Sequence, residues 1–322
     1  MTVSALRRLA GMLLTTWLLA SAVFLLLQAA PGDPLAALGG DFQSTETRAH
    51  LAQELGLNRS LGQRYVDWLN GLAQADLGRS YAYQRPVLEV ILERLPVTFA
   101  IVLPALLGAA LLGVALGFFA ARAPHSGVSR LTAALCLLLF AIPVYWLAHL
   151  LVQGFSLHLG WLPAQGLRDL RAMHSGAAAW LDLALHLLLP ICAAGLHQLA
   201  ALFLIARTRI ADEMRAPHFA TAIAKGLSLG HAQWRHALPQ AALSLVTLLG
   251  MRFAALLTSA TLVEIAFGLP GIGRLFVDAA RGRDYPLVLG VFLCVLLLTL
   301  LANTLSDLLC RQLDPRLRGA QR

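Results

Sequence analysis

The sequence is short of charged residues, and of lysine most of all. Only 13% of its 322 residues are Asp, Glu, Lys or Arg, and Lys225 is the only lysine. A soluble domain is usually about one quarter charged, whereas 58% of this chain is hydrophobic. A soluble fold would have no interior large enough for so many apolar side chains, so the composition predicts an integral membrane protein.

Motifs for metal binding and ATP hydrolysis are also missing. The four cysteines lie in or at the end of apolar stretches without a Cys-x-x-Cys pair, and the ten histidines form no His-Glu-x-x-His motif. A phosphate-binding P-loop needs Gly-Lys-Ser/Thr, but Lys225 stands between Ala224 and Gly226. We therefore expect no metal site, no bound cofactor and no ATP hydrolysis by this chain itself.

The net charge of +8 comes almost wholly from arginine. In a soluble protein this balance would indicate nucleic-acid binding. Here the basic residues flank apolar stretches, as they do when they set membrane topology, and no soluble surface interleaves aromatic with basic residues. We therefore expect the basic residues to lie beside a lipid bilayer, and we expect no nucleic-acid partner.

Long apolar runs are what the sequence has in excess. A helix needs roughly 20 apolar residues to cross a bilayer, and six stretches are long enough: 9–30, 96–121, 131–156, 182–206, 240–266 and 285–310. The first follows Arg7 and Arg8, as a signal peptide would, but it is longer than a signal core of about 7–15 residues. We predict an all-α membrane protein with six transmembrane helices and an uncleaved first span.

The distribution of basic residues predicts the topology. Six spans place both termini on one side of the membrane. With the termini in the cytoplasm, Arg and Lys are about twice as dense in the inner segments as in the outer ones, as the positive-inside rule requires. The inner segments are then 1–8, 122–130, 207–239 and 311–322, and the outer segments are 31–95, 157–181 and 267–284.

The outer segment 31–95 is long enough to have structure of its own. "TETRAHLAQELGLN" predicts a short helix ended by Gly56, "LGQRYVDWLNGLAQADLG" has apolar residues at helical spacing, and "RPVLEVILERLP" predicts a further amphipathic turn or two. We predict a small helical periplasmic cap. The chain then consists of the N-terminus and first span (1–30), the cap (31–95), a five-helix core (96–310) and a C-terminal tail (311–322).

The inner segment 207–239 contains the polar stretch "TAIAKGLSLGHAQWRHALPQA" (221–241). Thr221, Ala222 and Ala224 favour or tolerate a helix, and Gly226 stands where a left-handed residue would end it. Pro239 can open the next span, because its missing N–H costs nothing in a first turn. The sequence predicts a helix, a glycine turn and a second helix, and a solvated connector is the alternative.

A few polar residues within the spans are candidates for a translocation path. Arg252 lies thirteen residues beyond Pro239, about 20 Å of helix, and a charge at that depth should face the bundle interior or a water-filled cavity. Glu264 is about 18 Å further along the same helix and cannot pair with it. His197 and Gln198 in the fourth span and His149 in the third are the other candidates. Hydrogen bonds between helices are the alternative role for these three.

The segment 207–239 resembles the "EAA" loop of ABC importer permeases, in which EAA, three residues, Gly, nine residues and I-x-L-P follow one another. Gly226 and the stretch His236 to Pro239 fit this spacing, with His236 in place of isoleucine. Ala220, Thr221 and Ala222 occupy the triplet, so its glutamate is missing. Segments in the same order along the chain resemble the dipeptide/oligopeptide/nickel branch, in particular the first of its two permeases: "APGDP" (30–34), "DLGRS" (76–80), "LGWLPAQG" (159–166), "VEIAFGLPGIGRLFV" (263–277) and "DPRLR" (314–318).

This resemblance implies a type I ABC importer permease in a bacterial inner membrane. It implies a coupling helix that docks on an ATPase, with Ala220, Ala222 and Ala224 allowing close approach, Gly226 ending the helix, and Thr221 and Lys225 beside them. The partners it implies are a second homologous permease, two ATP-binding cassette ATPases that use ATP and Mg, and a periplasmic substrate-binding protein. The cargo would be peptides or nickel and metal chelates, moved by alternating access.

Two other functions remain open from the sequence. An ion-coupled secondary transporter without ATPase partners predicts paired acidic residues mid-span and inverted repeats, and neither is evident here. A membrane scaffold that transports nothing is the third possibility. Transport into vesicles with and without ATP distinguishes the three.

Overall fold

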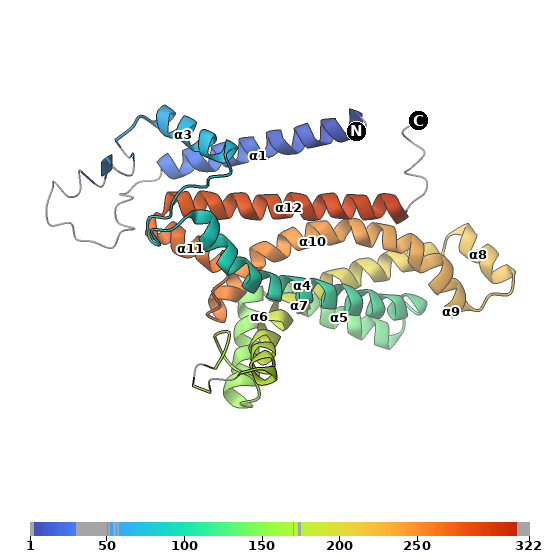
Figure 1. The fold of residues 1–322 in the computed structure, drawn as a ribbon. Coiled ribbons are helices and arrows are strands. Elements are labelled where there is room, and N and C mark those ends of the chain that lie inside the picture. The colour runs from blue at the N-terminus through green and yellow to red at the C-terminus, as the bar shows by residue number, and fades with distance from the viewer. Residues whose placement is uncertain are drawn as a thin grey trace. The chain divides into compact units, whose positions relative to one another are not determined.

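The computed structural model describes residues 3–29, 50, 52–53, 56, 58–169, 171–172 and 175–313. Within these ranges the regular structure is helical, apart from an isolated β-bridge between Arg79 and Pro86, and turns and loops join the helices. The elements are α1 (Val3–Ala29), α3 (Leu61–Ala73), α4 (Val87–Arg122), α5 (Gly127–Ala141), α6 (Val144–Leu151), the π-helix η2 (Val152–His158), α7 (Ala177–Met214), α8 (Pro217–Ala224), α9 (Leu229–Ala232), the π-helix η3 (Gln233–Ala237), α10 (Leu238–Ala266), α11 (Ile272–Gly282) and α12 (Tyr285–Leu313) (Figure 1). The predicted all-α class is confirmed.

The described residues contain five helices that are long and apolar enough to cross a membrane, or six if a bent pair counts as one span. The bent pair is the predicted third span, 131–156. Its two parts, Gly127–Ala141 and Val144–His158, meet at 103°, so the predicted third span is present as a bent helix pair. The break falls at Pro143, and Ile142 before it is extended (φ −74°, ψ 123°), because proline disfavours helical geometry in the preceding residue.

Two other helices begin earlier than the sequence predicted. Helix α4 starts at Val87, so the last part of the predicted cap is continuous with the second span. The fifth candidate span begins at Leu229 and includes α9 and η3, while Pro239 lies in the first turn of α10 itself, as predicted. In η3 just before this proline, Leu238 donates to the carbonyl of Gln233, five residues back. Such a π-helical turn accommodates an inserted proline, which lacks its own N–H.

The chain forms two compact units. The first consists of 1–97 and 270–300, so residues predicted for the five-helix core are grouped with those of the predicted cap. Its buried cluster joins the start of α4 to α11 and the start of α12, and includes Val87, Ile91, Ile272 and Leu287. In the same unit α3 packs on α1, where Phe24 stacks on Trp68 at 5.1 Å.

Helix α3 confirms one element of the predicted cap. Ser60 and Gln63 form a reciprocal capping box at its start, which satisfies backbone N–H groups that a helix otherwise leaves unpaired. The helix predicted in "TETRAHLAQELGLN" lies mostly outside the described residues. Gly56, its predicted end, has a positive φ of +66°.

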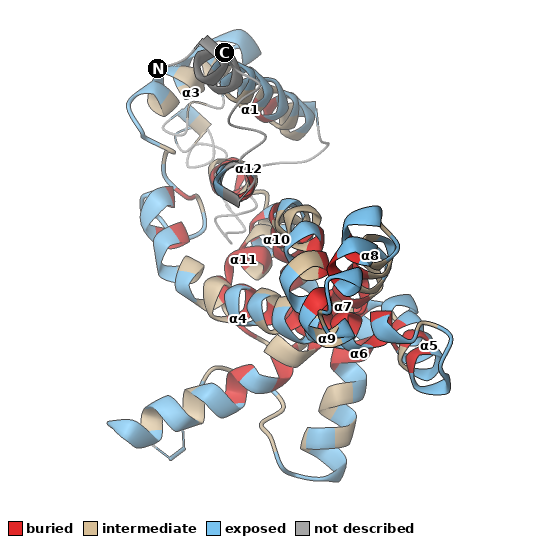
Figure 2. Ribbon diagram, turned by 90° about the vertical axis from the view of Figure 1, so that its right-hand side faces the viewer, coloured by how far each residue is buried: buried red, intermediate tan, exposed pale blue. Residues whose placement is uncertain are grey.

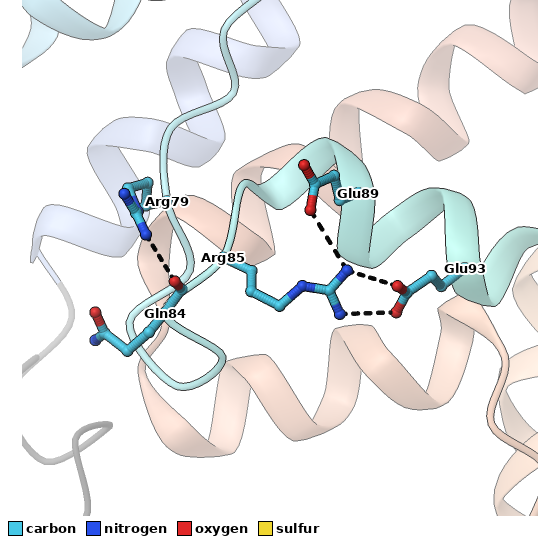
Figure 3. Close-up of polar contacts among 5 residues, drawn as sticks. All are labelled: Arg79, Gln84, Arg85, Glu89 and Glu93. Carbon is cyan, nitrogen blue, oxygen red and sulfur yellow. Dashed lines mark hydrogen bonds and ion pairs between the residues drawn. The ribbon is translucent and has the colours of Figure 1, made fainter.

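The loop before α4 is held by polar contacts (Figure 3). Arg79 donates to the carbonyl of Gln84 at 2.8 Å, and Arg85 pairs with Glu93 at 2.6 Å and with Glu89 at 3.4 Å. Beneath them the buried Asp284 accepts hydrogen bonds from the Ser80 hydroxyl and the backbone N–H of Ala82. The loop therefore satisfies much of its polarity within its own unit.

The second unit consists of 98–269 and 301–322, and α7 is the most buried of its candidate spans. A Cβ on Gly113 or Gly117 of α4 would meet the backbone of α7 at about 3 Å, so this Gly-x-x-x-Gly pair lets the two helices cross closely. Figure 2 shows many buried residues along α7, whereas most of α5 is exposed. Helix α7 is thus the centre on which this unit is built.

Candidate functional site

Helix α8 lies between the ends of the long helices α7 and α10 (Figure 1). It has eight residues and Pro217 at its first turn, where a missing N–H is tolerated. Its last residue is Ala224, and Gly226 follows with φ +91°. The predicted short helix ended by a left-handed glycine is therefore present in 207–239.

The two faces of α8 differ in burial. Phe219 and Ala222 are 4% and 5% exposed, whereas five residues on the opposite side and at the end are exposed: Ala220, Thr221, Ile223, Ala224 and Lys225. Apolar Ile223 is 38% exposed. We call these five residues the outer face of α8. Its residues are mostly small or apolar, and Lys225 is the only charged one.

Ala222 differs from what its place in the triplet suggested. It was expected among the residues that approach a partner, but it packs into the cluster that includes Phe118, Ala206 and Ala232. With 5% of its surface exposed, Ala222 offers little area for contact with another subunit. Of the predicted coupling residues, Ala222 therefore anchors α8, while Ala220, Thr221, Ala224 and Lys225 remain available.

A buried polar network fixes the segment that follows α8. The side chain of Gln233 in η3 is fully buried. It donates to the carbonyl of Phe118 at 2.6 Å and accepts from Nε of Arg122 at 2.6 Å. The Arg122 guanidinium lies over the Phe118 ring at 5.1 Å. Sequence reasoning missed Gln233, because its partners lie more than 100 residues away along the chain.

The intramembrane candidates fall into two groups. His197 is half-buried on α7 and stacks on Phe140 at 5.0 Å, and the charge of Arg252 on α10 acts on it. Gln198 beside it is 3% exposed. Among the described residues, Nδ1 of His197 and Oε1 of Gln198 have no hydrogen-bond partner. Buried polar atoms are rarely left unpaired, so these two atoms mark a place where a polar ligand would be accommodated.

His149 does not join this group. It is exposed on α6, its Nδ1 lies 2.9 Å from the carbonyl of Tyr145, and its ring lies 4.4 Å from the Tyr145 ring. These contacts hold the His149 side chain against Tyr145, which lies one helical turn earlier on the same helix. Of the predicted path residues, the structure thus brings together Arg252, His197 and Gln198 only.

Glu264, the single acidic residue of α10, has no exposed surface. The hydroxyl of Thr98 donates to its Oε1 at 2.6 Å and joins α4 to the end of α10. Beyond it, Gly268 turns the chain with φ +64°, and the Leu269 N–H bonds to the Glu264 carbonyl at 2.8 Å. The sequence showed only that Glu264 could not pair with Arg252 on the same helix. Thr98 was not identifiable, because hydroxyl residues are common in spans.

The chain matches two sequence families along nearly its whole length. Residues 113–319 match the "Binding-protein-dependent transport system inner membrane component" and residues 1–102 match the N-terminal region of such membrane components. A probable peptide ABC transporter permease of Sinorhizobium fredii is 32% identical over 99% of this chain and 100% of its own. A di/tripeptide transport system permease of Pseudomonas aeruginosa is 31% identical over 98% of both chains.

A solved structure supports the same fold. The crystal structure of an amino acid ABC transporter with histidines contains a chain that superposes with a TM-score of 0.52. It covers 70% of this chain and 94% of the solved one, at 15% identity. At this identity the likeness concerns the fold alone. The part of this chain that is covered therefore shares the fold of that solved chain.

Proposed function

Because the chain belongs to the family of inner-membrane components of binding-protein-dependent transport systems, we propose that it is the permease subunit of an ATP-driven importer of peptides. Its multi-pass helical fold and its full-length similarity to two peptide permeases support this function. The names of these relatives favour peptides over nickel or metal chelates as cargo. The observation that carries the mechanism is the outer face of α8, exposed on a helix whose other face is anchored in the core.

The outer face of α8 is the proposed docking surface for an ATPase subunit. A helix that transmits movement must contact its partner closely and must be fixed to the spans that move. Ala220 and Ala224 allow close approach, Ile223 supplies apolar area, and Phe219 and Ala222 fix the helix to α4 and α7. ATP and Mg would be used by two such ATPases, while this chain catalyses nothing. The coupling between them would drive alternating access.

The remaining partners follow from the same assignment. A second homologous permease would complete the pathway, and a periplasmic binding protein would deliver the peptide. With both termini in the cytoplasm, α8 would face the ATPases and α3 the periplasm. Cysteines introduced at Gln74 and Ser228, after removal of the native ones, should then react with an impermeant thiol reagent from opposite sides. Labelling of both from one side would contradict this topology.

Arg252, His197 and Gln198 form the proposed peptide path. A peptide presents a carboxylate, which the charge of Arg252 attracts, and amide N–H groups, which the unpaired Oε1 of Gln198 can accept. A charge within a span faces the bundle interior or water in most membrane proteins, and Arg252 makes no hydrogen bond or ion pair among the described residues. The site would thus hold a peptide by polar groups that the protein itself leaves unsatisfied.

The decisive experiment measures peptide import by the complete complex in proteoliposomes, with ATP supplied on the ATPase side. ATP-dependent uptake of a labelled dipeptide, with no response to an imposed ion gradient, is the expected result. Uptake driven by an ion gradient without ATP would indicate a secondary transporter. Absence of uptake with every partner present would leave only a scaffold.

A further inference from the structure

A long apolar groove lies between α4 and α10, and Leu202 of α7 also lines it. Its volume is about 680 Å³. The wall from α4 follows one helical face between Ala110 and Arg122, and the wall from α10 follows one face between Leu238 and Leu249. Of the described residues, Arg122 is the only charged one that lines it. Its lining is distinct from the group formed by Arg252, His197 and Gln198.

The depth of the groove matches one leaflet of a bilayer. Twelve residues separate Ala110 from Arg122, which is about 18 Å of helix at 1.5 Å per residue. Half of a hydrocarbon core of roughly 30 Å is about 15 Å. Both walls belong to helices that are long and apolar enough to span the membrane. An acyl chain that entered from the headgroup region would therefore be covered along most of its length.

The end of the groove at Arg122 can bind an anion. Arg122 is the last residue of α4 and is exposed. Its Nε donates to the buried Gln233, which orients the guanidinium, and neither terminal nitrogen has a hydrogen-bond partner within the part of the chain that the structure describes. Gly230 leaves space beside it, because a Cβ there would lie 3.2 Å from Nη2 of Arg122. Phosphate oxygens are natural acceptors for such a guanidinium.

Trp234 stands at the same end and is 64% exposed. Its ring meets Phe118 edge to face at 5.7 Å. Tryptophan is enriched at the headgroup level of membranes, so Trp234 and Arg122 together mark this end as the interface. A groove that is apolar in depth and basic at the interface complements a lipid with an anionic head.

We propose that this groove binds one anionic phospholipid, with an acyl chain along α4 and α10 and its phosphate on Arg122. A protein helix in the groove would bring no anion to Arg122 unless it carried an acid at that depth, so the charge favours a lipid. The bound lipid would brace η3 against α4 through Arg122 and Gln233. The proposal requires only that the chain lies in a bilayer, and it stands even if the cargo is not a peptide.

Native mass spectrometry of the complete, delipidated complex tests the proposal. Phosphatidylglycerol and phosphatidylcholine with identical acyl chains are added in turn, and the lipid retained per complex is measured. One basic side chain near a membrane surface contributes about 1 kcal/mol toward an anionic lipid, so a roughly fivefold preference for phosphatidylglycerol is expected. Arg122→Gln should abolish the preference, and Ala242→Phe, which fills the groove, should lower the retention of both lipids.

Matched variants separate binding from folding. Arg122→Lys keeps the charge but not the bond from Nε, so it should retain most of the preference. Arg130→Gln removes an exposed arginine from α5, outside the groove, and should retain all of it. Equal retention of the two lipids, or an unchanged preference in Arg122→Gln, would overturn the proposal. So would disulfide cross-linking of Leu111→Cys to the second permease, because that chain would then occupy the groove.

Discussion

The segment from α8 to η3 and the loop before α4 differ in which side chains they bury and which they expose. The loop pairs Arg79 with Gln84 and Arg85 with two glutamates of its own unit. The segment from α8 to η3 instead buries its polar anchor, Gln233, and leaves apolar Ile223 and Leu229 exposed. Exposed apolar groups beside a rigid anchor are typical of binding surfaces. The difference indicates that the polar contacts of the loop stabilise its own conformation, whereas α8 exposes a surface that a partner can bind.

Ala222→Trp is expected to have the largest effect on this comparison. Ala222 is 5% exposed and packs in the cluster that anchors α8. A large ring at this position forces its neighbours apart and destabilises the fold by at least about 1–3 kcal/mol. The variant should lose α8 order, ATPase binding and import together. Hydrogen exchange of 217–224 in the purified complex measures the first of these.

The matched control is Ala220→Trp on the outer face. It should leave hydrogen exchange of the free permease unchanged and weaken only the association with the ATPase. Equal behaviour of the two variants in both measurements would show that the two faces of α8 do not differ in role.

Gln233→Leu should rank second. It leaves the Phe118 carbonyl and Nε of Arg122 without their buried partner, and an unsatisfied buried group costs about 1–3 kcal/mol. The thermal midpoint of the complex should fall, and coupling should weaken because η3 loses its fixed position.

In the loop, Ser80→Ala should lower the thermal midpoint less than Gln233→Leu does, since Asp284 still accepts hydrogen bonds from the N–H groups of Ala82 and Leu287. A larger loss from Ser80→Ala would reverse the comparison.

Arg252→Met should affect import without affecting either anchor. The guanidinium makes no hydrogen bond or ion pair among the described residues, so its removal should not destabilise the fold. Peptide uptake should fall by roughly tenfold, the loss of one charge-assisted hydrogen bond, while basal ATP hydrolysis continues. Failure of the complex to assemble would instead assign Arg252 a structural role.

Arg85→Ala should have the smallest effect. Its pairs with Glu93 and Glu89 are exposed, and such pairs contribute about 0–1 kcal/mol. Import and thermal midpoint should both stay near those of the unaltered complex. A pronounced loss of import with normal stability would show that this loop also serves as a binding surface.

The sequence predicted what depends on local chemistry. Apolar length gave the candidate spans, and the left-handed geometry of Gly226 followed from its place after a helical run. Pro143 was visible in the sequence, but whether a proline bends, breaks or merely interrupts a helix depends on what packs around it. Pro190 lies within α7, for example, whereas Pro143 separates α5 from α6.

What the sequence could not predict depends on distant segments. Burial of Ala222 requires Phe118 and Ala232 to meet at α8, and the partners of Gln233 lie on α4. Helical periodicity is too weak in an eight-residue helix to decide which side faces the core. The unpaired atoms of His197 and Gln198 likewise became apparent only once Phe140 and Arg252 were placed beside them.

The central claim is that α8 couples ATP hydrolysis to import, and one measurement tests it directly. Peptide imported and ATP hydrolysed are measured in the same proteoliposomes for Gly226→Val and Gly127→Val. A Cβ meets nothing within 4 Å at either glycine, but only Gly226 has a positive φ, +91°. A β-branched residue there is strained by about 1–3 kcal/mol. We predict that Gly226→Val continues to hydrolyse ATP with little import, while Gly127→Val keeps the ratio of the unaltered complex. An unaltered ratio in Gly226→Val would contradict the account and leave 207–239 as a solvated connector.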